Sequence, residues 1–572
     1  MRHLSGPPGT GRASPWRGSG REWLIPVCLF LTAAAIRAIV ATQVPFPITE
    51  GSAYYIGVAH NIVEGDGLVS DAVWSYSTPP LVVPKPAFEL WLPMASLVSA
   101  LSMALLGPTF QAAQVGSVLL GALLAPLTWG VAQEAARAHG LDERRSRAVS
   151  LASGLLVAGL GPVVLAAVVP DSFTPYTVFS VAAALLAARL IRASTGEAVR
   201  PSARSSLLGR LALGGLLGLA YLSRQEVVWL GLAVVMGYWS TLRRAPRGTR
   251  AWAAWWHLAP VVVGGLCVVG PWLLRNMAVL GSPLPGQALQ NLWLLRNEDI
   301  FAFLERPDLT AYLAQGIGVL FGNVLAAAWE GLLNVLILPA FPVGLAGLIA
   351  LLGLRRSVAL RRPTALALLL LSGSLTFAAT VILFPVATRW GTFLHASGPL
   401  LVALVVLSAL GGDALVARIS AVRKWRRPNI ILAPIALLAV TLLLSLLQVR
   451  FAMSDAARLS ERYAGLAASL ERVAGAVGKP LPEVLMTDRP MWISGSLQRS
   501  AIALPDEPLN AVLELAATFD AYWLVVVDGR GRFPAALLDG PGRACLAQDP
   551  VALESGESPA WLMILDPACE RL

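Results

Sequence analysis

Charged residues are scarce in this chain of 572 residues: Asp, Glu, Lys and Arg make up only 14% of it, whereas 56% of the residues are hydrophobic. A soluble protein with so few charges would expose large apolar patches, so the composition predicts a polytopic α-helical membrane protein. Lysine is nearly absent, and arginine supplies most of the net charge of +10. Because these arginines lie in short loops between apolar segments, they indicate membrane topology and argue against a nucleic-acid partner.

Several motifs of known chemistry are also missing. The chain has no Walker loop, no HExxH motif, no cysteine pair at metal-binding spacing and no Ser-His-Asp order. Its five histidines are scattered singly, which predicts no histidine metal site, although two acids could still share a divalent cation. No internal or inverted repeat is present, and the apolar segments carry few polar residues in mid-span. These absences make a transporter or flippase the weaker alternative.

The arginine-rich loops predict which side of the membrane each segment faces. Such loops mark the cytoplasmic side, so the chain crosses the membrane an even number of times between any two of them. This parity makes the apolar segment 87–107 interfacial or re-entrant at the outer face, and it splits residues 207–241 into two short helices that turn at residues 223–226. About eleven transmembrane helices are then expected, at residues 23–44, 109–133, 148–168, 173–192, 207–222, 226–241, 257–275, 331–354, 364–386, 393–411 and 429–448.

Hydropathy falls after Arg450, which indicates a second domain. A strand-like run at 484–488, a helix-like run at 509–519 and a strand-like run at 522–528 predict a small C-terminal α/β domain outside the cytoplasm. Cys545 and Cys569 in this domain could form a disulfide or remain free. The expected domains are a disordered cytoplasmic tail at residues 1–22, a transmembrane domain at 23–449 with long outer loops at 45–108 and 276–330, and the extracytoplasmic domain at 450–572.

The first outer loop, residues 45–108, is long, aromatic and acidic. So much polar sequence at the lipid surface indicates chemistry or recognition there. Glu50 follows the first span directly and could act as a general base that takes a proton from an acceptor, and a solvated loop acid is the plain alternative. Asp171 lies at the tip of the next outer hairpin, where it is either a second functional acid or only the N-cap of the following helix.

Basic residues on the outer side run against the usual bias of membrane proteins, so each needs a local reason. Lys85 lies between two prolines that hold it extended. Its ammonium is expected at the membrane surface, where it would either contact lipid headgroups or hold a phosphate. Arg275, Arg389 and His395 are also expected to face outward, and an anionic ligand would explain them.

Short motifs follow one another along the chain: Glu50 with Tyr54 and Tyr55, His60-Asn61, Glu64-Gly65-Asp66-Gly67, Lys85-Pro86, Asp171, and Pro271-Trp272 with Arg275-Asn276. In order and spacing they resemble the motifs of the GT-C glycosyltransferases, membrane enzymes that use polyprenyl-phosphate sugars. The resemblance is greatest to the bacterial branch related to protein O-mannosyltransferases and the lipid A aminoarabinose transferase, and it covers roughly residues 20–450. The first-loop acid of that family is usually an aspartate, often followed by Glu, whereas this chain has Glu50-Gly51-Ser52. The proline pair that normally opens the interfacial helix is Lys85-Pro86-Ala87 here.

The resemblance implies transfer of a sugar from a polyprenyl-phosphate-linked donor to an acceptor glycan, lipid or protein, on the outer face of a bacterial plasma membrane. It implies a carboxylate base in the first outer loop, a second acid in the next outer turn, and basic residues that hold the lipid phosphate. The alternatives are a transporter or flippase, and a non-catalytic membrane scaffold whose outer domain binds a partner. The expected site residues are catalytic Glu50 and Asp171, and substrate-binding Lys85, Arg275, Arg389, His395, Tyr55 and His60.

Overall fold

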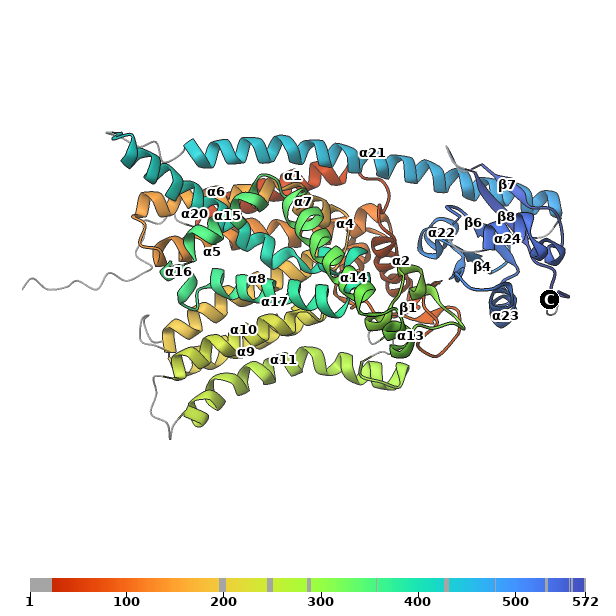
Figure 1. The fold of residues 1–572 in the computed structure, drawn as a ribbon, viewed down its shortest axis with the longest axis horizontal. Coiled ribbons are helices and arrows are strands. Elements are labelled where there is room, and N and C mark those ends of the chain that lie inside the picture. The colour runs from red at the N-terminus through yellow and green to blue at the C-terminus, as the bar shows by residue number, and fades with distance from the viewer. Residues whose placement is uncertain are drawn as a thin grey trace, which may run out of the picture.

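Apolar helices form a bundle, and a small α/β domain lies at one end of it (Figure 1). The cytoplasmic tail predicted over residues 1–22 lies outside the described part of the chain. The computed structural model describes residues 23–194, 202–243, 250–284, 290–355, 357–425, 432–478, 480–529, 533–554, 556 and 559–569.

Within the described residues, eight helices are long and apolar enough to cross a membrane, or up to nine if a bent pair counts as one span. The bent pair is α6 (Glu143–Gly159) and α7 (Gly161–Val168), which meet at an angle of 51°. Pro162 in the first turn of α7 lacks the N–H group that would continue α6, which explains the break. The eight are α1 (Leu24–Ala41), α4 (Phe110–Ala122) with α5 (Leu124–Ala138), α8 (Phe173–Ser194), α11 (Arg250–Leu280), α14 (Ile317–Glu330) with the π-helical η4 (Gly331–Ile337), α17 (Ala365–Leu383), α20 (Gly398–Val422) and α21 (Leu432–Val477).

The predicted division of residues 207–241 into two helices is confirmed by α9 (Ala203–Tyr221) and α10 (Val227–Leu242), which flank a short turn. The predicted span 331–354 is wrong. The helix begins at Ile317, inside the predicted outer loop, and runs to Ile337. Pro339 and Pro342 cannot donate backbone hydrogen bonds and interrupt it, so α15 (Val343–Leu354) is a separate helix.

Two loops that the sequence assigns to the cytoplasmic side meet at one end of the bundle. His139 lies between α5 and α6, and Ser357 lies just before α16 (Val358–Arg361). The distance from His139 Nδ1 to Ser357 Oγ is 2.6 Å. The first outer loop and the C-terminal strands lie at the opposite end (Figure 1). The structure thus separates these loops from the predicted outer elements, while the assignment of either end to a cell compartment stays a prediction.

The first outer loop contains α2 (Glu50–Glu64). The residues that flank this helix explain where it begins and where it ends. The Thr49 side chain accepts a hydrogen bond from Ser52 N at 3.1 Å and caps the N-terminus. Gly65 has a φ of 100°, a conformation that favours glycine, and it ends the helix. Beyond it, β1 (Val69–Ser70) pairs antiparallel with β3 (Lys85–Pro86), and α3 (Met94–Leu106) packs against α2 and α4. The predicted interfacial segment 87–107 is therefore helical only from Met94 onward.

The C-terminal domain is built on a six-stranded sheet of order β2-β5-β4-β6-β8-β7. Strands β5, β4 and β6 run parallel, as the strand–helix–strand pattern predicts, and β8 and β7 are antiparallel to their neighbours. One edge strand, β2 (Ala72–Val73), comes from the first outer loop and pairs in parallel with β5. The C-terminal domain therefore includes a strand from the loop that follows α2. The other bounds are β4 (Val484–Thr487), α22 (Pro490–Leu497), β5 (Ser500–Ala503), α23 (Leu509–Phe519), β6 (Trp523–Val526), α24 (Phe533–Asp539), η5 (Pro541–Cys545), β7 (Val551–Leu553) and β8 (Ala560–Ile564).

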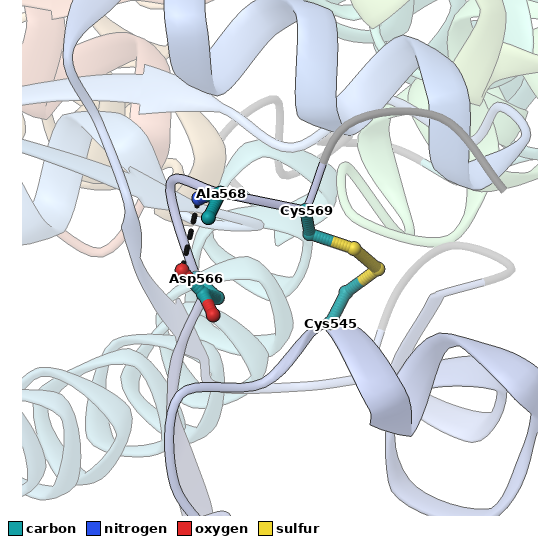
Figure 2. Close-up of a disulfide and its surroundings, with 4 residues drawn as sticks. All are labelled: Cys545, Asp566, Ala568 and Cys569. Carbon is teal, nitrogen blue, oxygen red and sulfur yellow. Dashed lines mark hydrogen bonds between the residues drawn. A yellow bond between two sulfur atoms is a disulfide. The ribbon is translucent and has the colours of Figure 1, made fainter.

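A disulfide joins Cys545 to Cys569 in this domain, with a Cα–Cα distance of 5.4 Å (Figure 2). The sequence left this pairing open. The bond ties the end of η5 to the segment after β8, beside a turn in which Ala568 N donates to Asp566 Oδ1 at 2.9 Å. The long helix α21 runs from the bundle into the same domain, so the predicted last span at 429–448 is only its first half (Figure 1).

Candidate functional site

Glu50, at the first position of α2, forms an ion pair with Arg489 of the C-terminal domain. Arg489 lies between β4 and α22, and its Nε and Nη2 also bind Asp528 Oδ2, at 2.7 and 2.6 Å. Asp528 follows β6, the strand parallel to β4. Arg489 and Asp528 therefore lie at the carboxyl ends of two parallel strands, β4 and β6. This is the edge at which α/β sheets commonly place functional groups. The Glu50 side chain is 17% exposed, so the solvated-acid alternative does not describe it.

The Asp528 carboxylate is held from two sides. Burial raises the pKa of Asp528, but Arg489 and Arg462 outweigh it and hold that pKa below its usual value. Arg462 Nη1 lies 2.9 Å from Asp528 Oδ1. Arg489 also stacks on Trp492, 5.4 Å from the ring centroid, and Trp492 Nε1 donates to Pro47 O at 2.9 Å. The whole network thus lies against the chain that leads into α2.

Asp171 lies in the turn between α7 and α8 and is 7% exposed. Its Oδ1 accepts from Ser172 Oγ at 2.9 Å and Phe173 N at 3.1 Å, and lies 2.9 Å from His395 Nδ1. Burial raises the pKa of Asp171, but His395 and these hydrogen bonds outweigh it and lower the pKa to about 2. Asp171 therefore binds the first N–H of α8, as the cap alternative predicts, and remains ionised.

The second oxygen of Asp171 points toward the start of α2. A Cβ added to Gly51 would lie 3.8 Å from Asp171 Oδ2. No residue in the described part of the chain donates a hydrogen bond to this oxygen. The missing side chain at Gly51 thus leaves room beside a free carboxylate oxygen, one residue from Glu50. The two predicted catalytic acids lie on neighbouring elements, although each has its own basic partner.

Arg224 lies beside the Asp171 turn. The sequence placed this residue only in a turn between two helices and gave it no role. Its Nη2 lies 2.6 Å from Glu226 Oε1, Nη1 donates to Ser172 Oγ at 3.3 Å, and Nη2 donates to Thr392 O at 3.2 Å. The Tyr55 hydroxyl contacts Ser172, and burial, with Asp171 nearby, raises the pKa of Tyr55. An Arg-Gln-Glu turn between two apolar helices was the available signal, because charges at the outer end of a hairpin need a local reason.

Helix α2 contributes to two cavities. The smaller, of about 270 Å³, lies at the outer ends of α10 and α17. Tyr55, Arg224 and Glu226 line its polar side, and its apolar wall is formed by Leu90, Trp91, Leu92, Trp229, Leu383 and Phe384. The larger cavity, of about 610 Å³, lies between α2, the α3–α4 turn and the C-terminal domain. Residues of α2 that line it include Ala53, Gly57, His60, Asn61 and Glu64.

Lys85 is not at the membrane surface, so that expectation is wrong. Only 2% of the residue is exposed, and its Nζ lies 2.8 Å from Glu89 Oε2 and 2.6 Å from Ser75 O. Burial lowers the pKa of Lys85 and raises the pKa of Glu89, each opposed by the charge of its partner. Glu89 follows four residues later and draws the ammonium inward, which makes the pair a structural contact of the outer loop.

Of the remaining predicted residues, Arg275 and Arg389 lie apart from the Asp171 turn, and His395 contacts it. Arg275 donates to Ala87 O at 2.9 Å and to Leu68 O at 3.2 Å, and so fastens α11 to the first outer loop. Arg389 is exposed at the end of α18 (Pro385–Arg389) and has no ion-pair or hydrogen-bond partner within the described ranges. His395 belongs to α19 (Thr392–Ala396) and lies at Asp171. Of the predicted set, Asp171, His395 and Tyr55 form one cluster, with Glu50 next to it.

Within the described residues, no three His, Cys, Asp or Glu side chains lie close enough together to hold a metal ion. Glu50 contacts Arg489 and Asp171 contacts His395, so the two acids do not fit as shared ligands of one divalent cation in this arrangement.

The chain has the GT-C fold, the fold of polytopic membrane glycosyltransferases. It is similar to the archaeal oligosaccharyltransferase AglB from Archaeoglobus fulgidus, solved in complex with an inhibitory peptide and a dolichol-phosphate, with a TM-score of 0.53 and 11% identity over 89% of this chain and 70% of that chain. It is also similar to ArnT from Cupriavidus metallidurans, with a TM-score of 0.53 and 14% identity over 95% of this chain and 98% of that chain. ArnT bound to undecaprenyl phosphate gives the same TM-score at 13% identity. No family model and no curated protein sequence matches the chain. The predicted fold class is confirmed, and at these identities the likeness shows the fold alone.

Proposed function

We propose that this protein is a membrane glycosyltransferase that transfers a sugar from a polyprenyl-phosphate-linked donor to an acceptor on the side of the membrane where the α/β domain lies. The observation that carries the proposal is the smaller cavity. It combines an apolar wall at the outer ends of membrane helices with a polar end where Arg224 lies beside the Asp171 turn. That ArnT has been solved with undecaprenyl phosphate and AglB with a dolichol-phosphate supports a donor of this kind.

The donor's two parts match the cavity's two sides. A polyprenyl chain is apolar and lies against Trp91, Leu383 and Phe384, while the phosphate reaches Arg224. A guanidinium suits this task because its planar array of N–H groups matches phosphate oxygens. Glu226 now holds one side of Arg224, and a phosphate would replace part of that ion pair. Lys85, which the sequence favoured for this role, is held inside the loop by Glu89.

The acceptor approaches from the larger cavity, on the side of α2 that carries His60. A volume of about 610 Å³ is typical of small-molecule sites and accommodates a sugar or a short segment of a larger acceptor. The cavity reaches Pro47 and Trp492, which contact each other beside the Glu50–Arg489 pair. The larger cavity reaches α2 at Ala53 and the smaller one at Tyr55, so acceptor and donor would approach each other close to the N-terminal end of this helix.

The different surroundings of the two acids support different roles for them. With a pKa of about 2, Asp171 is a weak base, so its free Oδ2 is suited to accept a hydrogen bond from a substrate hydroxyl. Glu50 takes the proton from the acceptor hydroxyl or amine. The acceptor atom then forms a bond to the anomeric carbon while the bond from that carbon to the phosphate oxygen breaks, and the phosphate leaves with the electron pair, stabilised by Arg224.

Binding of the leaving group tests this proposal without knowledge of the sugar. Undecaprenyl phosphate is added to purified protein in detergent, and the bound lipid is measured by native mass spectrometry for the wild type, Arg224→Met and Arg472→Met. Arg472 is a matched control because it forms an exposed ion pair with Glu554 on the C-terminal domain. We expect binding that weakens at least 10-fold in Arg224→Met only. No saturable binding to the wild type, or equal binding to all three proteins, would contradict the proposal.

A further inference from the structure

The C-terminal domain contacts two loops of the membrane bundle, residues 45–108 and 276–330, at several separate places. Strand β2 of the loop adds to the domain's sheet beside β5, and the Tyr76 hydroxyl donates to Ala503 O. The Glu507 carboxylate accepts backbone N–H groups of residues 303–305 in another outer loop. Trp492 contacts Pro47 directly before α2. The domain therefore presents its residues to α2 in a defined position.

We propose that Arg489 is a positioning residue that holds the Glu50 carboxylate at the reaction centre from the other domain. This inference rests on the proposed function. The guanidinium divides its donors: Nε and Nη2 bind Asp528, and Nη1 binds Glu50. The C-terminal domain thus sets the direction in which Arg489 points, and Glu50 is the residue that is held.

The anchor behind Arg489 is itself secured. Arg462 of α21 binds the other oxygen of Asp528 at 2.9 Å. The Asp488 carboxylate accepts the N–H groups of Val527 and Asp528, both at 2.8 Å, and so joins the ends of β4 and β6. Removal of Glu50 would leave Arg489 held by its anchor, whereas removal of Arg489 would take away the ion pair that binds Oε1 of Glu50. A side chain held by a second residue in this way is a recognised means of fixing catalytic geometry.

The position of Arg489 has a chemical consequence for its partner. Arg489 occupies one oxygen of the Glu50 carboxylate and so selects the direction from which an acceptor reaches the other oxygen. Loss of Arg489 is therefore expected to slow turnover and leave binding of the donor lipid unchanged, because Arg489 does not line the smaller cavity.

A double-mutant cycle separates this role from a purely structural one. Radiolabelled polyprenyl-phosphate mannose, glucose, galactose and arabinose are offered as donors, and kcat and KM for the one that is used are measured for the wild type, Arg489→Met, Glu50→Gln and the double variant, with Arg472→Met as control. We expect kcat to fall at least 10-fold in Arg489→Met with KM within about twofold, and the double variant to be no slower than Glu50→Gln. Arg489→Lys should recover part of the rate, because it keeps the positive charge. The recovery should be incomplete, because one ammonium cannot bind both carboxylates as a guanidinium does. Losses that multiply in the double variant would overturn the proposal.

A second readout needs no turnover and keeps this inference separable from the proposed function. Carboxyl groups are labelled with a water-soluble carbodiimide and an amine, and the modification of Glu50 is measured by peptide mass spectrometry. We expect Glu50 to be labelled several-fold faster in Arg489→Met than in the wild type or Arg472→Met. If no donor is turned over but labelling rises, the proposed function fails while Arg489 still holds Glu50. Equal labelling in all three proteins would show that Arg489 does not hold Glu50 and would overturn the inference.

Discussion

His395 Nδ1 lies 2.9 Å from Asp171 Oδ1, and this contact joins α19 to the turn before α8. With one carboxylate oxygen occupied by His395, Ser172 and Phe173, only Oδ2 remains for a substrate. That oxygen faces Gly51, where the absence of a side chain leaves space. In the proposed mechanism, the pairing therefore leaves Oδ2 as the oxygen of Asp171 that contacts the substrate, reached from the side of Gly51.

Substitutions at Gly51 test the space beside Asp171. A Cβ there would lie 3.8 Å from Asp171 Oδ2, an ordinary van der Waals contact, so Gly51→Ala should retain most of the activity. Gly51→Leu should extend across the oxygen and lower turnover at least 10-fold, with little change in the thermal unfolding midpoint. Steady-state kinetics of both variants check this, and equal rates for Ala and Leu would show that substrate does not use this space.

Asp171 should also make stability depend on pH. Its pKa is about 2 in the folded protein against 3.8 for a free aspartate, which corresponds to about 2 kcal/mol. Because the folded pKa is the lower one, this stabilisation is present above about pH 4 and is lost as pH falls toward 2.

The measurement is the difference in thermal unfolding midpoint between the wild type and Asp171→Asn, taken at pH 7 and at pH 3. We expect a clear difference at pH 7 that shrinks at pH 3. The same difference at both pH values would show that the ionised carboxylate is not what stabilises this turn.

The Lys85–Glu89 pair should behave as a structural contact. Lys85→Met leaves the Glu89 carboxylate buried without its cation, a change that typically costs about 3–5 kcal/mol. We expect a lower unfolding midpoint and poorer yield, with the donor KM of the surviving protein unchanged. Adding Glu89→Gln to Lys85→Met should restore much of the stability. A stable Lys85→Met protein with a strongly raised donor KM would instead assign the phosphate to Lys85.

Local sequence patterns predicted the fold well because they depend on neighbouring residues. Apolar runs marked the helices, basic flanks divided residues 207–241 into α9 and α10, and strand-like runs located two strands of the C-terminal sheet, β4 and β6. The error at residues 331–354 was also local in origin. The prediction followed the hydropathy, which is continuous across Pro339 and Pro342. In the structure these two prolines interrupt the helix all the same.

The site was harder to predict because its contacts join distant segments. Arg489 and Glu50 are separated by 439 positions, and no spacing rule connects residues so far apart. Arg224 and Ser172 meet across 52 positions because two hairpins pack together. For Lys85 a local signal existed, since Glu89 follows at the four-residue spacing at which opposite charges commonly pair. A lysine at this position suggested a phosphate ligand, but in the folded loop the carboxylate of Glu89 binds the Lys85 ammonium instead.

Release of sugar from lipid-linked donors tests the central claim most directly. Purified protein in detergent is incubated with radiolabelled polyprenyl-phosphate mannose, glucose, galactose and arabinose, together with membranes as the source of acceptor, for the wild type beside Glu50→Gln. We predict turnover of one of these donors by the wild type and a loss of roughly 10²–10⁴-fold in Glu50→Gln, the usual contribution of a general base. Wild-type rates in Glu50→Gln, or no turnover of any donor by the wild type, would contradict the account.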